Sequence, residues 1–132
     1  DVYKRQTQAF VADYDRRFQK LPSLYGFSHF SGAMWVAEAL KTIGADAENR
    51  ERLLAAVRAT TLTGSPLGAP VSLDAYGNPV YDAFIRRVVR RPDGKLWNAA
   101  VETYPRVDQF WGFDPETYMR QPAYSRAFQG PR

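Results

Sequence analysis

The 132-residue sequence predicts an α/β chain in which three helices are followed by β-hairpin strands and an aromatic, proline-rich tail. Up to residue 60, apolar residues recur every three or four positions, which is the spacing of one helical face. Glycine and proline then recur between residues 64 and 79, where they indicate turns. Beyond residue 80, β-branched and aromatic residues alternate with polar ones, as they do in strands. This order of elements does not close a layered fold, so we expect the chain to be part of a larger one.

The first expected helix starts at Thr7 and ends at Leu21, because Pro22 disfavours helical geometry in the residue before it. Its apolar stripe consists of Phe10, Val11, Tyr14, Phe18 and Leu21. Residues 1–6 fit neither neighbouring pattern, and we interpret them as a non-native leader. The chain shows no secretory signal, and no apolar run approaches the roughly 18 to 20 residues that span a bilayer.

A second helix is expected from Ser23, whose hydroxyl can cap the first turn, to about Ile43. Gly44 is placed to end it in a left-handed turn. Trp35 lies off the main apolar face, which favours burial on more than one side. The main face carries Phe27, Phe30, Met34, Ala37 and Leu40.

The third expected helix follows closely, with Asp46 as its cap. Glu48 would lie in the first turn and Arg58 near the last, where each charge suits the helix dipole. The core face of this helix is expected to consist of Leu53, Leu54 and Val57.

The second half of the chain predicts strands joined by tight turns. Residues 71–74 are expected to form a short strand, followed by a turn at residues 75–78. A second strand at residues 80–91 and a third at residues 95–104 are joined by a turn at residues 92–94. In the third strand the inward side chains are expected to be Trp97, Ala99 and Val101.

The tail from residue 105 is rich in rings, which are costly to leave in water. Asp114 followed by Pro115 suits the cap and first turn of a short helix. We expect the tail to be held against the body by Phe110, Trp111, Phe113, Tyr118, Tyr124 and Phe128.

The net charge of +4 rests on 18 basic and 14 acidic residues, and a basic surface is one signature of nucleic-acid binding. The candidate strip consists of Arg86, Arg87, Arg90 and Arg91, with Trp97 as a stacking platform. Strand alternation sends the first and third of these arginines to one face and the second and fourth to the other. We therefore favour an exposed edge strand protected by charge.

Residues for nucleophilic or acid–base catalysis are scarce. The chain has no cysteine, and its one histidine, His29, lies inside the second helix. Ser28 and Ser31 flank it but point elsewhere on a helix, and no Gly-x-Ser-x-Gly elbow is present. The carboxylates at positions 13 and 15, and at 114 and 116, are two residues apart, which places them on different helical faces.

Cofactor motifs are equally absent from the sequence. Residues 64–68 resemble a glycine-rich loop but lack the lysine and the following helix that a phosphate loop requires. One histidine and scattered acids provide no recognisable set of metal ligands. We therefore predict no catalytic residue, no metal site and no cofactor, and an enzyme is the least supported class.

Three segments carry a resemblance to a known family. The first runs from Phe10-Val11-Ala12-Asp13-Tyr14 to Leu21-Pro22-Ser23-Leu24-Tyr25, where a helix ends in a proline and an aromatic residue. The second is residues 67–79, with a glycine, a short strand, an aspartate and a Gly-Asn turn. The third comprises residues 103–111, 114–116 and 121–126. Together they resemble the C-terminal region of type I periplasmic binding proteins of the branched-chain amino acid class.

The resemblance implies that residues 7–132 are the C-terminal part of a receptor whose two α/β lobes close on a small ligand. The ligand would be an amino acid or a small amide, bound without covalent chemistry in the periplasm or another extracytoplasmic compartment. The membrane permease and ATPase of an ABC importer would be the partners. Many relatives carry Tyr-Asp-Ala where this chain has Phe30-Ser31-Gly32, so any role of that aspartate is absent here.

From this region of the family, an aromatic residue at the entry to the second helix is the expected ligand contact, and Tyr25 fits that position. Ser23 and Phe27 are further candidates. The alternative for Tyr25 is a capping aromatic packed on Leu21. Two other functions stay open: a receptor-like sensory module with the same clamp, and a small basic nucleic-acid-binding α+β domain.

Overall fold

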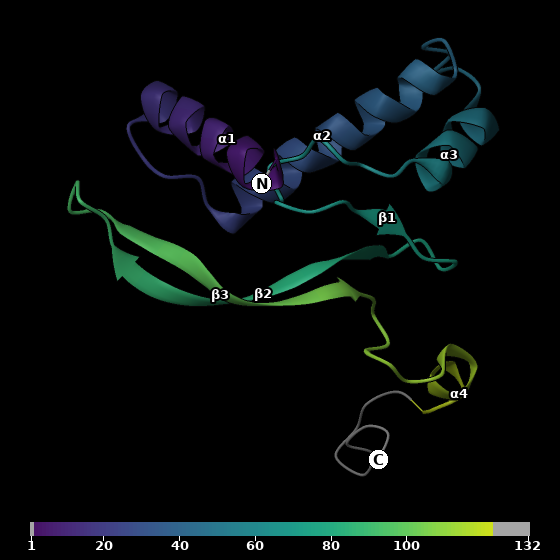
Figure 1. Ribbon diagram of the computed structural model, residues 1–132. Coiled ribbons are helices and arrows are strands. Elements are labelled where there is room, and N and C mark those ends of the chain that lie inside the picture. Colours follow the sequence, from purple (N-terminus) through teal and green to yellow (C-terminus); the bar gives the residue numbers. More distant parts are fainter. Residues whose placement is uncertain (1, 123–132) are drawn as a thin grey trace.

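The computed structural model describes residues 2–122, with side chains from residue 5 onward, as helices and a three-stranded antiparallel sheet (Figure 1). The first three helices lie on one side of a long, curved hairpin, and the short fourth helix lies on the other. The predicted order of three helices followed by hairpin strands is confirmed. The elements are α1 (Val2–Phe18), α2 (Leu24–Thr42), α3 (Arg50–Ala59), β1 (Ser72–Leu73), β2 (Pro79–Arg90), β3 (Leu96–Val107) and α4 (Pro115–Met119).

Helix α1 includes residues 2–6, which the sequence pattern set apart, and it ends at Phe18 rather than at Leu21. Gln19 has a φ of 54°, and its N–H donates to the Asp15 carbonyl at 2.8 Å. The helix therefore ends in a left-handed residue before the proline can act on it.

Helix α2 begins as predicted, with the Ser23 hydroxyl accepting a hydrogen bond from the Gly26 N–H. Gly44 has a φ of 66°, as expected for the residue after the helix end. The burial pattern differs from the expected stripe, because the buried residues of α2 are Ser31 and Ala39, whereas Phe30 is 48% exposed.

Helix α3 is capped by Asn49, whose side-chain oxygen accepts from the Arg52 N–H at 3.0 Å. The expected cap, Asp46, instead forms an ion pair with the Arg52 guanidinium. Glu48 precedes the helix, and Glu51 occupies the first turn. The core between α2 and α3 consists of Ala39, Ile43 and Ala56, with Leu40, Leu53 and Val57 packed against it. Leu54 is 52% exposed, which corrects its placement on the core face.

Helix α2 is held on both sides, as its aromatic content predicted. On the α1 side, the centroid of the Phe10 ring lies 5.0 Å from that of Phe27 and 4.7 Å from that of Phe30. On the α3 side, the Trp35 indole N–H donates to the Val57 carbonyl at 3.0 Å. Helix α2 is therefore the central element of the helical layer.

The sheet has the order β1-β2-β3, and β1 contributes only two residues. The turn after β1 closes as predicted, with Asp74 N–H donating to the Asn78 carbonyl and Gly77 at a φ of 85°. Strand β3 continues to Val107, three residues beyond its expected end. Val101 does not face inward, because Ile85 pairs with Glu102 and Arg86 with Ala100, which leaves Val101 as an extra residue.

Part of the tail packs on the body. Phe110 is only 3% exposed, and its ring contacts the rings of Tyr76 and Tyr118. Asp114 caps α4 as predicted. Trp111 is 59% exposed but its ring contacts that of Tyr104 in β3, whereas Phe113, 43% exposed, contacts Tyr118 within the tail. The remaining two rings of the prediction, at positions 124 and 128, lie outside the described residues. None of the helices within residues 2–122 is both long enough and apolar enough to cross a membrane.

Candidate functional site

The junction between α1 and α2 holds the three residues proposed from sequence. Ser23 is the cap of α2, in an extended backbone conformation, and its hydroxyl oxygen lies 3.2 Å from the Gly26 nitrogen. This hydrogen bond satisfies one of the free N–H groups of the first helical turn. The hydroxyl proton stays available to a second acceptor.

Tyr25 follows in the first turn of α2, with 74% of its surface exposed. It is therefore not buried against Leu21 as a capping aromatic would be. Its neighbour Leu24 is also 74% exposed. The helix thus presents two large, solvent-facing side chains beside its capped N-terminus.

Phe27 points to the other side of the helix. It is half-buried, and its ring packs on Phe10 of α1. Phe10 in turn contacts Tyr14, whose ring lies 4.6 Å from that of Phe18. The structure thus places Phe27 in a chain of rings between the helices, while Tyr25 and Ser23 lie at the surface.

His29 and Ser28 are engaged with the backbone of α2 rather than with each other. The Ser28 hydroxyl donates to the Leu24 carbonyl at 3.0 Å. The His29 Nδ1 lies 2.8 Å from the Tyr25 carbonyl oxygen, which can only accept, so Nδ1 is the donor in this contact. These contacts offer no base for a serine nucleophile.

The carboxylates that the sequence paired all have separate structural partners. Asp13 binds two arginines of α1, and the pKa of Asp13 is lowered chiefly by the hydrogen bond from Arg16. Asp114 accepts from the Thr117 N–H at 2.8 Å, which lowers the pKa of Asp114. Within residues 2–122, no three histidine or acidic side chains gather as a metal site.

Asp74 is the centre of the β1–β2 turn. Loss of hydration raises the pKa of Asp74, but hydrogen bonds to its carboxylate from Asn78, Gln109 and Tyr76 lower it more, so the net shift is downward from 3.8. The three oxygen contacts are 2.8 to 2.9 Å long. This carboxylate therefore ties the turn to the segment after β3 and is not poised for proton transfer.

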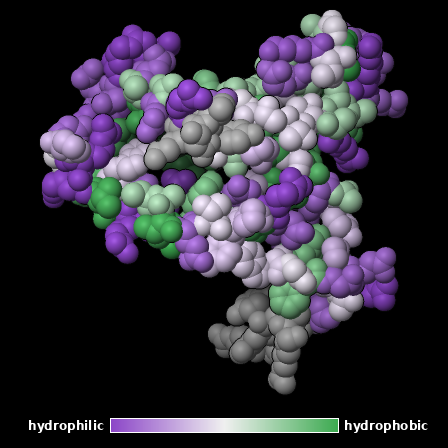
Figure 2. Space-filling view, in the orientation of Figure 1, coloured by the Kyte–Doolittle hydropathy of each residue, from purple (hydrophilic) through white to green (hydrophobic). Residues whose placement is uncertain are grey.

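Two open grooves border these elements. One, of about 550 Å³, lies between α2, α3 and residues 60–64 and is lined in part by Met34, Glu38, Thr42, Thr60, Thr61 and Thr63. The other, of about 340 Å³, is lined by Leu21, Pro22, Val88, Leu96, Trp97 and Asn98. Figure 2 shows hydrophobic side chains at the surface over the half of the hairpin nearest its turn. None of the three residues proposed from sequence lines either groove.

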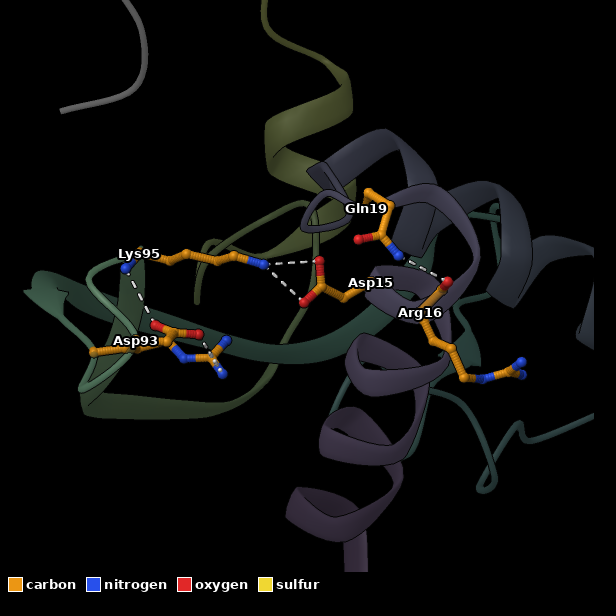
Figure 3. Close-up of polar contacts among 6 residues, drawn as sticks. Asp15, Arg16, Gln19, Asp93 and Lys95 are labelled. Atoms are coloured by element: carbon orange, nitrogen blue, oxygen red, sulfur yellow. Dashed lines mark hydrogen bonds and ion pairs between the residues drawn. The ribbon is translucent and has the colours of Figure 1, made fainter.

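The hairpin turn is held to α1 by one ion pair, shown in Figure 3. The Lys95 Nζ lies 2.8 and 3.0 Å from the two carboxylate oxygens of Asp15. Within the turn, Asp93 accepts from the Lys95 N–H and pairs with Arg91. The turn is therefore tied to α1 where it meets the helical layer.

The hairpin arginines do not form one basic strip. Cross-strand pairing puts Trp97 opposite Val89, on the face that carries Arg87 and away from the face of Arg86 and Arg90. Arg90 donates to the Gly94 carbonyl, and Arg91 pairs with the turn aspartate. The face of Trp97 therefore carries Arg87 and, by alternation, Arg91, whose guanidinium pairs with Asp93, while the other two arginines lie on the opposite face.

Two solved structures resemble this chain. An ABC transporter substrate-binding protein from Sphaerobacter thermophilus matches 76% of the chain with a TM-score of 0.69 and 32% sequence identity. The solute-binding protein of an ABC transporter from R. palustris, in complex with benzoate, matches 77% with a TM-score of 0.61 and 27% identity.

The chain has part of a substrate-binding protein fold. It spans about a quarter of each of these proteins, since the match covers 27% of either one. No protein-family model matches the chain, and no curated protein matches it in sequence. At 32% and 27% identity the likeness extends to sequence as well as fold, and it agrees with the kind of protein that the sequence segments resemble.

The two grooves were not predicted. The 550 Å³ groove follows the run Thr60-Thr61-Leu62-Thr63, where α3 gives way to an isolated bridge between Leu62 and Val71. The available signal in the sequence was the point where the helical spacing of apolar residues gives way to a run of β-branched threonines, which marks the end of the helix beside the groove. The second groove joins residues more than 60 positions apart, which no local pattern in the sequence reveals.

Proposed function

We propose that this chain is the C-terminal part of an extracytoplasmic receptor that binds a small molecule and delivers it to an ABC importer. The observation that carries the proposal is the match of about three quarters of the chain to two transporter-linked binding proteins. Two lobes would close on the ligand without covalent chemistry. The partners would be a membrane permease and its ATPase, and the cellular location the periplasm or its equivalent.

The surface of the chain supports its being one piece of a larger fold. It exposes 9993 Å², whereas a compact monomer of 15.0 kDa is expected to expose about 7,000 Å². Among the described residues, seventeen large hydrophobic side chains are exposed, against nine hydrophobic residues that are buried. Surfaces of this kind are typical of a domain from which neighbouring elements are missing.

In this proposal the ligand is an amino acid or a small amide, and Tyr25 is its aromatic contact on this chain. Tyr25 has an open ring face and a hydroxyl, so it can both pack on a ligand and hydrogen-bond to it. Ser23 would contribute its hydroxyl proton. Phe27 would fix the position of the first turn of α2 through its packing on Phe10.

A second candidate ligand class is an aromatic carboxylate. The R. palustris protein was solved in complex with benzoate, and the match to it covers 77% of the present chain. An exposed tyrosine ring suits an aromatic ligand at least as well as an aliphatic one. The two candidates are chemically distinct, because benzoate has a ring and a carboxylate but neither an α-amino group nor an amide.

Calorimetric titration of the full-length protein that contains this chain tests the proposal, with amino acids, their amides and benzoate in one panel. Tyr25→Ala is expected to weaken binding by about tenfold or more, as loss of an aromatic contact typically does. Leu24→Ala is the matched control, because Leu24 has the same exposure and lies next to Tyr25. No binding across the panel would contradict the receptor function, and equal losses in the two variants would contradict the role of Tyr25.

A further inference from the structure

The hairpin leaves two long strand edges without a partner. Strand β1 pairs with β2 only at Val80 and Pro79, so within the described residues β2 has no neighbour on that side from Tyr81 to Arg90. Strand β3 likewise has no neighbour on its outer side in the part of the chain that the structure describes. A free edge is a template for pairing, and a two-stranded ribbon is only marginally stable. The two edges are built differently.

Strand β3 carries the irregularities that mark a true edge. Between the pairs Tyr81–Val107 and Ala83–Tyr104, β2 advances two residues and β3 advances three. The bulge at Val101 likewise places its extra residue on β3. Pro105 lacks an N–H, and Arg106 has a φ of 51°. Bulges and prolines are the devices by which proteins keep an edge strand from pairing.

Strand β2 has none of these features between Tyr81 and Arg90. It contains no glycine, no proline and no extra residue in that stretch. Large apolar residues occur on both faces, with Phe84 and Val88 on one and Ile85 and Val89 on the other, interleaved with Asp82, Arg86, Arg87 and Arg90. Ile85 and Val88 are 52% and 63% exposed, so both faces of the strand present apolar surface of the kind that neighbouring elements cover.

Two of the three arginines of β2 make contacts within the hairpin itself. The Arg86 guanidinium lies over the Phe84 ring, 5.5 Å from its centroid. The Arg90 guanidinium donates to the Gly94 carbonyl at 2.8 Å. Both guanidinium groups therefore contact groups of the hairpin, and among the described residues no second strand pairs with the β2 backbone from Tyr81 to Arg90.

We infer that β2 is an interior strand, and that its second neighbour is a strand from the part of the receptor polypeptide outside these 132 residues. The inference rests on the proposed function, in which a longer chain is present. The surplus of exposed surface, about 3,000 Å² over a compact monomer, exceeds the roughly 800 Å² that one partner covers in an ordinary interface. It therefore favours the rest of a fold over a second copy.

Residue-resolved amide hydrogen exchange on the full-length protein tests the added strand. The alternate β2 amides that do not bind β3 are expected to exchange about tenfold or more slowly than the corresponding outward amides of β3, because each gains a hydrogen bond worth about 1.4 kcal/mol. The outward amides of β3 are the internal control, since they stay free in the same molecule.

Equal, fast exchange of the outward amides on both strands would overturn the inference. It would support the alternative in which β2 is an edge strand protected by its charged side chains. Protection of β2 that falls on dilution would also overturn it, because the partner would then be a second copy. Titration of the same preparation with the ligand panel separates the two proposals. Protected β2 amides in a protein that binds no ligand would refute the receptor function and leave the added strand standing.

Discussion

Removing the Lys95–Asp15 ion pair should measurably loosen the hairpin from the helical layer. The variants are Lys95→Met, Asp15→Asn and the double variant, whose free energies of unfolding together isolate the pair. The Nζ lies within 3.0 Å of both carboxylate oxygens, and the two side chains are 43% and 29% exposed. The contact joins residues 80 positions apart, so its loss affects tertiary rather than local structure.

The magnitude follows from the geometry and exposure. Two unit charges about 3 Å apart attract by roughly 5 kcal/mol at an effective dielectric constant near 20. Partial hydration and the entropy of two fixed side chains offset most of this, so exposed pairs contribute about 0.2 to 1 kcal/mol. Both oxygens of Asp15 are engaged, and we expect a coupling energy near the top of that range, about 1 kcal/mol at low salt.

Urea unfolding of the four proteins at about 20 mM and about 0.5 M sodium chloride provides the measurement, because screening shortens the range of exposed charges. The coupling energy should fall by about half at the higher salt. The Lys41–Glu38 pair is the matched control, since it lies within α2 with exposures of 70% and 44%. Its coupling should not exceed about 0.5 kcal/mol. A Lys95–Asp15 coupling no larger than that of the control would refute this reasoning.

Trp35→Phe keeps a ring but removes the N–H that binds the Val57 carbonyl, so the free energy of unfolding should fall by about 1 kcal/mol, measured by urea titration. Ser23→Ala should cost about 1 kcal/mol and Ser23→Thr much less, and equal losses would contradict the capping role. The folded pKa of Asp74 lies below its unfolded value of 3.8, so its stabilising contribution is complete above that value and is lost as the pH falls through the folded pKa. Asp74→Asn should therefore flatten the decline of stability in acid, and an unchanged acid profile would contradict the assignment.

Local chemistry made much of the fold predictable. Ser23 and Gly44 bound α2 because a hydroxyl cap and a left-handed glycine act within one turn of the chain. Asp114 caps α4 for the same kind of reason. The start of α3 was misplaced because Asp46 and Asn49 are equally good caps locally, and packing of Ala56 against α2 selects the later start.

Features that depend on register or on distant segments were not predictable. The bulge at Val101 arises from how β3 pairs with β2, and a pattern of alternating residues cannot reveal one extra residue. Ser31 and Ala39 are buried on α2 because small residues allow close approach of other segments, while a hydrophobic stripe favours larger ones such as Phe30. The exposure of Tyr25 was likewise hidden, because an aromatic residue after a cap can lie on either side of the helix entry.

The three tryptophans of the chain occupy three different surroundings, and this makes the molecule its own optical reporter. Trp35 is half-buried and hydrogen-bonded between two helices, Trp97 lies in the hairpin, and Trp111 is 59% exposed beside the tail. An indole in water emits at longer wavelength than one shielded by protein. Variants that keep one tryptophan at a time would therefore show, without any attached dye, which of these regions is covered when further polypeptide or a ligand is present.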